Sequence, residues 1–397
     1  MRKVELLAPA GDLERLKVAV LYGADAVFIG GQRFSLRSRA SNFSIDDIKE
    51  ACSFAHLHGA RVHVTCNIVM HNIDTEEVLS YLKELENAGV DCIIASSLYI
   101  LKLVIENTKM EAHVSTQMST ANQMGVKFFK ELGANRVVLA RELKMTEIKK
   151  IKDEIDMPLE VFIHGGMCSS YSGRCMLSNN MTNRDANRGG CAHSCRWNYD
   201  LLIDDEKKND DGYFQISSRD LSALRLIPKL IDLNVDSFKI EGRMKSLNYI
   251  AVVVRTYRKL IDEYYENGSI KDFSIYEKDL KMAENRKTGT GFLDHDITID
   301  EMLYDNGLSI PTKDFIGLVL SYDETKHICY FEQRNNFASF DNVIIFTPKG
   351  NIKLNIGQIY DMDGNKMERC PHPLQKLYFY TDIKLNKYDL IRMEDEI

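Results

Sequence analysis

Short apolar stretches alternate with longer amphipathic ones along the first 267 residues. In stretches such as 45–59 and 75–89, apolar residues recur at spacings of three and four and a glycine closes the pattern, which is typical of surface helices. The expected strands are residues 4–9, 24–31, 60–68, 90–96, 111–116, 135–140, 159–165 and 235–242. Eight strand–helix units predict a closed (β/α)₈ TIM-like barrel over residues 1–267. A doubly wound open sheet is the alternative, because residues 166–234 interrupt the alternation.

The pattern changes after the amphipathic stretch 246–267, which we expect to pack on the barrel wall. Polar and charged residues dominate the stretch 268–314, which we therefore interpret as a linker. Between residues 315 and 397, short alternating stretches separated by turns predict a small antiparallel β-barrel domain. Its expected strands are 315–323, 327–335, 342–350, 353–361, 376–382 and 388–393.

The composition is that of a globular protein. Of the 397 residues, 44% are hydrophobic and 27% are charged, and no apolar run is long enough to span a bilayer. The first twelve residues also lack the apolar core of a signal peptide. These features predict a cytoplasmic protein without a membrane partner. The formal net charge of -7 argues against a uniformly basic surface for nucleic acid, but it is compatible with a local basic groove.

Four of the nine cysteines lie in one glycine-rich segment, residues 160–197. Disulfides are the weakest explanation, because cytosolic thiols are normally kept reduced. Structural zinc usually uses two tight cysteine pairs, whereas an irregular set of four thiolates suits a [4Fe-4S] cluster at least as well. Inert buried thiols are the remaining explanation. The predicted metal ligands, for an iron–sulfur cluster or alternatively zinc, are Cys168, Cys175, Cys191 and Cys195. The predicted core thiols are Cys52, Cys66, Cys92, Cys329 and Cys370.

A barrel of this kind carries its active site at the C-terminal ends of its strands. Polar residues just beyond the expected strands should therefore converge there. His164 is expected there either as a satisfied core residue or as a hydrogen-bond donor to a cluster sulfur, an acid or a base. The residues at the strand ends are Arg33, Arg37, Arg39, Asn67, Ser115, Gln117, Arg141, Glu142, His164, Glu241 and Arg243. The candidate catalytic residues among them are His164, Glu241 and Arg243.

Arginine is frequent near this predicted barrel mouth. Planar guanidinium groups bind phosphate or carboxylate through paired hydrogen bonds, which suits RNA and also a small dicarboxylate. An ordinary surface ion pair is the alternative for any single arginine. Further arginines in or near the cysteine-rich segment are Arg174, Arg184, Arg188, Arg196 and Arg219. The candidate substrate-binding residues are Arg33, Arg37, Asn67, Gln117, Arg141, Arg174 and Arg219.

Six stretches resemble the U32 family, which is named for collagenase-like peptidases. They are FIHGGMCSSYSGRC followed by LS, GADAVFIGGQRFSLRSRASNF (23–43), VSTQMS (114–119), NRGGCAHSCRW (187–197), SSRDL (217–221) and KIEGRMKS (239–246). They occur between residues 23 and 246. The ending CAHSCRW is most similar to the tRNA hydroxylation branch of the family.

This resemblance implies an enzyme that makes 5-hydroxyuridine at the wobble position of tRNA. With the cysteine set, it implies a [4Fe-4S] cluster as cofactor and prephenate, a small dicarboxylate, as co-substrate. The implied partners are the tRNA anticodon stem-loop and a paired U32 homologue as a second subunit. The resemblance also implies a small C-terminal β-barrel domain.

A peptidase, as the family's older name suggests, is the alternative function. The sequence contains neither a His-Glu-x-x-His nor a Gly-x-Ser-x-Gly motif. A cysteine nucleophile needs an adjacent base, and Cys168 with His164 is the nearby pair. Cys191→Ser should abolish a metal-dependent activity but leave a Cys168 nucleophile largely intact. A non-catalytic subunit of a larger enzyme is the third hypothesis.

Overall fold

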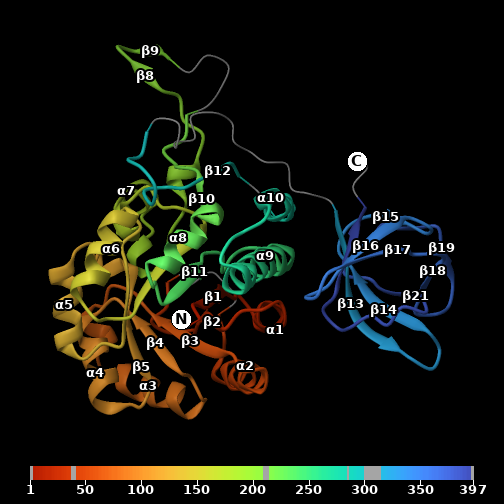
Figure 1. Cartoon of the computed structure of the whole chain (residues 1–397), viewed down its shortest axis with the longest axis horizontal. Coiled ribbons are helices and arrows are strands. Elements are labelled where there is room, and N and C mark those ends of the chain that lie inside the picture. Colours follow the sequence, from red (N-terminus) through yellow and green to blue (C-terminus); the bar gives the residue numbers. More distant parts are fainter. Residues whose placement is uncertain (1–2, 37–41, 209–213, 284–285, 299–313, 395–397) are drawn as a thin grey trace. The chain divides into compact units, whose positions relative to one another are not determined.

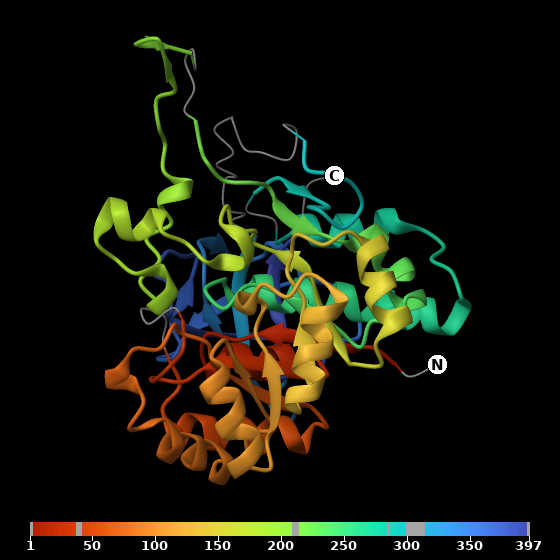
Figure 2. The same cartoon turned by 90° about the vertical axis from the view of Figure 1, so that its left-hand side faces the viewer.

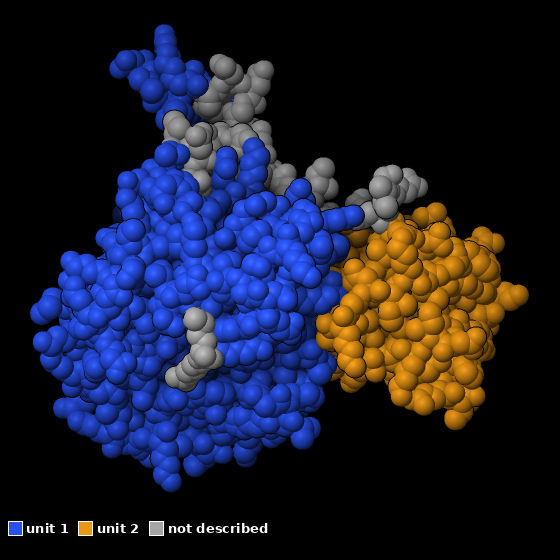
Figure 3. Space-filling model, in the orientation of Figure 1, with its two compact units in different colours: residues 1–309 blue, residues 310–397 orange. Residues whose placement is uncertain are grey.

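The computed structural model describes residues 3–36, 42–208, 214–283, 286–298 and 314–394. The chain divides into two compact units, residues 1–309 and residues 310–397 (Figure 3). Each unit has its own sheet and its own hydrophobic core. Among the described helices, none is both long enough and apolar enough to cross a membrane.

Eight parallel strands form a closed barrel in the first unit (Figure 1). They follow one another around the barrel in chain order, and the last strand pairs with both the seventh and the first. This closure confirms the predicted (β/α)₈ barrel and rules out the open sheet. The strands are β1 (Glu5–Pro9), β2 (Ala26–Gly30), β3 (Arg61–Cys66), β4 (Cys92–Ala95), β5 (Glu111–Val114), β6 (Arg136–Val138), β7 (Leu159–Gly165) and β11 (Ser237–Ile240).

Amphipathic helices surround the strands. Helix starts follow the sequence signals: Asp12 and Ser44 cap the first two helices, and Ser246 caps the longest one. The longest helix is almost entirely buried in its first eleven residues, as expected for a helix on the barrel wall. The helices are α1 (Leu13–Leu21), α2 (Ile45–Leu57), α3 (Val78–Asn87), α4 (Leu98–Asn107), α5 (Gln123–Leu132), α6 (Met145–Glu154), α8 (Ile227–Asp232) and α9 (Leu247–Asn267).

A buried ion network fills the N-terminal end of the barrel interior. The Lys239 ammonium lies 2.7 Å from one carboxylate oxygen of Glu160, and Arg136 lies 3.1 Å from the other. Arg136 also pairs with Glu5, which accepts a hydrogen bond from Ser237. Burial alone would raise the pKa of Glu160, but Lys239 and Arg136 outweigh it and lower the pKa to about 2. The two acidic and two basic side chains therefore neutralise each other. 

A long excursion separates β7 from β11. It contains the cysteine-rich segment, α7 (Leu177–Thr182) and a small hairpin of β8 (Leu202–Ile203) and β9 (Glu206–Lys207). The chain then returns along β10 (Asp220–Ser222), which runs antiparallel to β7. The residues before and after the excursion thus lie next to each other in the sheet.

The expected linker 268–314 is wrong in its first part. Helix α10 (Phe273–Lys281) packs on α9 through buried Tyr276 and Leu280, four residues apart. Strand β12 (Thr288–Gly289) then pairs with β10. These elements belong to the first unit, because a few buried residues suffice to dock an otherwise polar stretch. Residues 299–313 of the expected linker lie outside the described residues.

The second unit is an antiparallel sheet domain, as predicted. Alternate residues of its strands, such as Cys329, Phe331 and Phe379, enter a common core. The expected strand 353–361 is two strands, separated by Gly357 at a φ of 66°. The larger sheet of the second unit contains β13 (Phe315–Asp323), β14 (Ile328–Gln333), β16 (Asn342–Phe346), β17 (Asn351–Asn355), β18 (Ile359–Asp361), β19 (Lys366–Met367), β21 (Lys376–Tyr380) and β22 (Leu390–Met393). A small second sheet pairs β15 (Phe337–Ala338) with β20 (Arg369–Cys370).

Candidate functional site at the barrel mouth

Beyond the end of β7 at Gly165, the cysteine-rich segment covers the loops that follow other strands of the barrel. Figure 2 shows this yellow-green segment and the β8–β9 hairpin at the same end of the barrel. Gly165 makes the exit: its φ is 108°, and a Cβ atom there would lie 2.2 Å from the carbonyl oxygen of Glu241. No other residue type fits this close approach. The segment therefore lies at the C-terminal ends of the strands.

Three polar contacts attach the first part of the segment to the barrel loops. Both carboxylate oxygens of Glu142 accept hydrogen bonds from Ser172, from its amide at 2.7 Å and its hydroxyl at 3.0 Å. Arg174 donates to the carbonyl of Gln117 at 2.5 Å. Arg141 donates to the carbonyl of Gly166 at 2.9 Å. Candidate residues after β5 and β6 are thus in direct contact with the segment.

A second group of contacts attaches its central part. The Val69 amide donates to the carbonyl of Asn187 at 2.9 Å. The Arg188 guanidinium binds both carboxylate oxygens of Asp74, at 2.6 and 3.1 Å. Arg188 also donates to the Val69 carbonyl. The Arg188 guanidinium therefore holds the segment in place and is not available to a substrate.

The four cysteines lie on irregular backbone that side chains hold in place. The Asn187 amide binds both the amide and the carbonyl of Cys175, at 3.1 and 3.0 Å. The buried hydroxyl of Ser178 accepts from the amide of Ala192, next to Cys191. Such fixed loops position ligands before any bound group is present. Cys191 is exposed, and the other three thiols, Cys168, Cys175 and Cys195, are half-buried.

Cys168 lies within electrostatic reach of two of the other thiols. Burial raises the pKa of Cys168, nearby Arg141 lowers it, and thiolates at Cys195 and Cys175 would raise it. Among the described residues, the four thiols do not place three sulfur atoms within 4.8 Å of one another. A single tetrahedral zinc ion holds its sulfur ligands roughly 3.8 Å apart.

Several arginines at this face have no carboxylate partner among the residues that the structure describes. Arg174 and Arg184 donate to backbone carbonyls, which leaves their positive charge uncompensated. Elsewhere in the first unit, guanidinium groups such as Arg258 bind carboxylates. Within the described part of the chain, the arginines of this face without an ion pair are Arg174, Arg184, Arg196 and Arg219.

A basic cluster that the sequence analysis missed lies beside Cys195. Arg286 and Lys245 share one buried carboxylate, Asp220, at 3.3 and 3.7 Å. Burial lowers the pKa of Lys245, and the positive charges of Arg196 and Arg286 lower it further against the attraction of Asp220. Two cations thus pair with one carboxylate, and the positive charge of Arg196 acts on Lys245 from nearby. The arrangement leaves an excess of positive charge that an anion would compensate.

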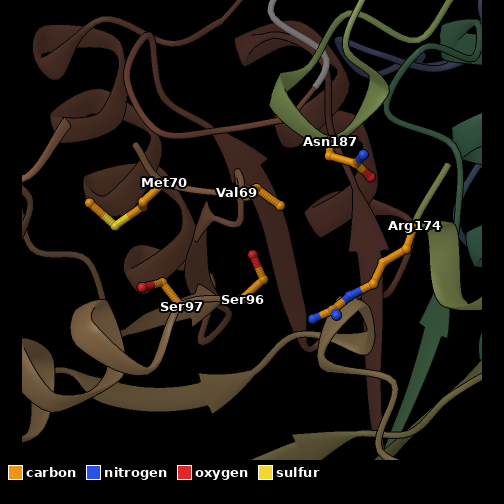
Figure 4. Close-up of a pocket in the computed structure, with 6 residues that line it drawn as sticks. All are labelled: Val69, Met70, Ser96, Ser97, Arg174 and Asn187. Atoms are coloured by element: carbon orange, nitrogen blue, oxygen red, sulfur yellow. The ribbon is translucent and has the colours of Figure 1, made fainter. Parts of the chain in front are cut away.

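A pocket of about 340 Å³ opens between the segment and the loops after β3 and β4. Figure 4 shows Arg174 and Asn187 on the side of the segment and Met70 and Ser97 opposite them. The side chain of Gln117 is buried under the segment, at 7% exposure, and its oxygen has no hydrogen-bond partner among the described residues. Such an orphan acceptor marks a place where a ligand or a water binds.

Arg243 and Asn67 both bind the backbone of Leu36, in the loop after β2. The Arg243 guanidinium donates to the hydroxyls of Ser35 and Thr65, at 3.0 and 3.4 Å, and to the carbonyl of Leu36. Asn67 accepts a hydrogen bond from the Leu36 amide at 3.1 Å. Gly30 leaves the space that the guanidinium occupies. Both residues therefore hold the loop after β2.

The remaining described candidates contact residues in or next to α3 and α9. His164 packs between Tyr249 and Tyr257 of α9, bonded to the Tyr257 hydroxyl at 3.2 Å. Burial lowers the pKa of His164 to about 3, so this ring is neutral and serves as a core residue. The Glu241 carbonyl binds the Tyr249 hydroxyl. Arg33 forms an exposed pair with Glu77 at 3.6 Å. Two further candidates lie outside the described residues, Arg37 and Arg39.

The missed cluster had a weak sequence signal. Lys245 lies in KIEGRMKS, directly after the candidate residues of the last barrel strand. Arg286, however, lies in the polar stretch taken for a linker. Only the docking of α10 and β12 brings it to Asp220.

Comparisons with known proteins agree with this architecture. A family model described as "Peptidase family U32" matches residues 11–302, and one described as "Peptidase family U32 C-terminal domain" matches residues 311–392. A "tRNA hydroxylation protein P1" of Bacillus subtilis is 45% identical over 98% of this chain and 95% of its own length. A "tRNA hydroxylation protein P" of Escherichia coli is 31% identical over 94% and 92%. A "23S rRNA 5-hydroxycytidine C2501 synthase" of Escherichia coli is 39% identical over 66% and 40%.

Proposed function

Because this chain belongs to peptidase family U32, we propose that it is an RNA hydroxylase that acts on a pyrimidine of tRNA. The observation that carries the proposal is the group of arginines without carboxylate partners beside four cysteines at the barrel mouth. RNA presents a row of phosphates, which such guanidinium groups bind. The relatives named for tRNA hydroxylation support the same substrate class.

The base that we infer is the uridine at the wobble position, and the product that we infer is 5-hydroxyuridine. An anticodon loop offers unstacked bases that a protein can hold outside the stack. Tyr171 and Trp197 of the cysteine-rich segment expose 54% and 42% of their surface. Exposed aromatic rings of this kind stack on bases. Their position beside the thiols supports a loop, rather than a duplex, as the substrate.

The cofactor that we propose is a [4Fe-4S] cluster held by Cys168, Cys175, Cys191 and Cys195. The irregular spacing of the four cysteines along the sequence suits a cluster at least as well as zinc. A cluster with four thiolate ligands would supply electron transfer. The protein's own part is to hold the thiols through Asn187 and Ser178 and to neutralise their charge through Arg141.

The basic cluster of Arg196, Lys245 and Arg286 fits a small dicarboxylate co-substrate, for which we propose prephenate. Two carboxylates would relieve the repulsion among these three cations, of which Lys245 and Arg286 share Asp220. Guanidinium groups also bind carboxylates through paired hydrogen bonds. This assignment places the co-substrate beside Cys195.

The peptidase alternative has less support. A thiol peptidase needs a base within hydrogen-bond reach of its nucleophile. In the described residues no hydrogen bond joins Cys168 to a histidine, and His164 is bonded to Tyr257 and buried under α9. The pair that a cysteine mechanism would need is therefore not formed.

The test is anaerobic purification with iron and sulfide analysis, combined with tRNA nucleoside analysis in a strain that lacks the gene. We expect about four iron and four sulfide per chain and restoration of 5-hydroxyuridine derivatives by the wild-type gene. Cys191→Ser should lose the metal, and the level of modified nucleoside in tRNA should fall at least about 100-fold. Cys52→Ser replaces a core thiol that lies far from the cysteine-rich segment in the sequence. It is the matched control and should retain both the metal and the modification.

Two results would contradict the proposal. Unchanged tRNA nucleosides in the deletion strain would remove the assigned substrate. Proteolytic activity that persists in Cys191→Ser, with no metal bound to either form, would return the peptidase alternative.

A further inference from the structure

We propose a second metal site inside the barrel, formed by His63, Cys92 and His113, that holds one zinc-like divalent cation. The three residues come from the neighbouring strands β3, β4 and β5, and His63 and Cys92 are direct partners in the sheet. One ligand atom from each lies within 4.8 Å of the other two. The two imidazole rings meet nearly at right angles, with centroids 5.2 Å apart.

Unsatisfied nitrogens point to a missing partner at this place. All three side chains are fully buried. Both ring nitrogens of His63 and Nδ1 of His113 have no hydrogen-bond partner among the described residues. Buried polar groups in folded proteins are almost always paired. A cation bound between these side chains would use two of the three orphan nitrogens.

The surroundings of His113 match those of a metal-bound histidine. Its Nε2 lies 2.9 Å from the carboxylate of Glu111. When this nitrogen carries the proton, the lone pair of Nδ1 is free for a metal. Ligating histidines commonly donate their second N–H to a carboxylate in this way, which fixes the ring and strengthens the ligand. His113 would therefore bind the cation directly, and Glu111 would hold the His113 ring in place.

The donor set indicates the class of cation. Two imidazoles and one thiolate suit zinc, whereas magnesium and calcium prefer oxygen ligands. Burial lowers the pKa of His63 to about 3 and also lowers that of His113, so both rings are neutral, as ligands must be. Burial raises the pKa of the Cys92 thiol, and the binding step therefore releases its proton to solvent as the Cys92 sulfur–metal bond forms.

The site differs in kind from the thiols at the barrel mouth. Its three side chains have no exposed surface, so a cation would be enclosed as the barrel folds. Three protein ligands leave a fourth position inside the barrel. The proposal concerns a structural ion and is independent of the proposed RNA hydroxylation.

The first test uses a full-length variant in which all four mouth cysteines are serine. Expressed with cobalt and purified, this variant should bind about one cobalt per chain and show the thiolate-to-cobalt absorption of a Cys₁His₂ site. All three inner ligands are present, so the result does not depend on whether an inner substitution folds. A variant that is folded by circular dichroism but contains no bound cobalt or zinc would overturn the proposal and leave a buried water as the partner of His63.

A second measurement compares zinc content among single substitutions in the otherwise natural chain. Cys92→Ala and His63→Phe should each contain about one zinc fewer per chain than the wild type. Cys66→Ala is the matched control, because its thiol is equally buried in β3 but does not belong to the cluster, and it should keep the full content. Equal zinc in all four proteins would also overturn the proposal.

Discussion

The two ends of the barrel use the same charged residue types in opposite ways. At the N-terminal end, Arg136 and Lys239 each find a carboxylate, and the network has no net charge. At the mouth, Lys245 and Arg286 share Asp220, and Arg174 and Arg184 donate to backbone carbonyls. A buried charge that is fully paired contributes to packing and specificity, whereas an uncompensated one is available to an anion. Pairing, rather than residue type, therefore separates scaffold from candidate site.

The largest effect is expected from breaking the paired end. Glu160→Ala removes the carboxylate that binds both Lys239 and Arg136 and leaves buried charge uncompensated. We expect a loss of about 3–5 kcal/mol in the free energy of unfolding, measured by urea denaturation. Asp153→Ala, which breaks the exposed pair with Lys149, is the control and should change it by less than about 0.5 kcal/mol. A loss below about 1 kcal/mol for Glu160→Ala would show that the network is dispensable.

An intermediate effect is expected from acid acting on His164. The pKa of this histidine is about 3 in the folded protein and about 6.5 when unfolded. The folded state therefore binds fewer protons between these values. The contribution of His164 to the free energy of unfolding is fully present above pH 6.5 and is lost as the pH is lowered, by up to about 1.4 kcal/mol per pH unit.

His164→Phe should remove this contribution and lower the slope of the pH profile between pH 6.5 and 4, measured by denaturation at each pH; the remaining slope comes from other buried histidines such as His63 and His113. His58→Phe replaces an exposed histidine of the same unit and should leave the profile as it is. A profile of His164→Phe as steep as that of the wild type would place the acid sensitivity elsewhere.

The smallest effect is expected at the mouth. Arg219→Ala should weaken tRNA binding by about 1 kcal/mol and lower the salt dependence of log K by about one unit, because one phosphate contact is lost. Its free energy of unfolding should stay within about 0.5 kcal/mol of the wild type. Arg225→Ala, whose guanidinium already binds Glu277 at 2.6 Å, is the matched control in filter-binding titrations. Equal losses for both variants would contradict the contrast between paired and unpaired arginines.

The barrel could be predicted because its strands are nearly continuous apolar runs, which a parallel sheet buried on both faces produces. The cysteine-rich segment could be found because its residue types are rare and clustered.

The side to which His164 points could not be predicted. Glu160 and Phe162 face the interior by strand alternation, but the pairing of β7 with β11 shifts by one residue before His164. This irregularity turns the histidine toward α9.

The sequence also could not predict which charged residues pair when they are far apart along the chain. Lys245 and Arg286 are forty-one positions apart, and only the fold brings them to one carboxylate. The same holds for the barrel interior, where His63, Cys92 and His113 each resemble an ordinary strand residue and converge only when β3, β4 and β5 lie side by side.

The pairing of Gly165 with Leu221 has a consequence for folding and for evolution. The chain leaves the sheet and re-enters it at adjacent residues, so the whole excursion 166–220 is a loop whose ends the barrel already holds together. For such a loop, each doubling in length costs only about 0.6 kcal/mol of closure entropy. The barrel can thus close before the excursion takes shape, and insertions or exchanges within it can alter substrate choice with little penalty to the strands beneath.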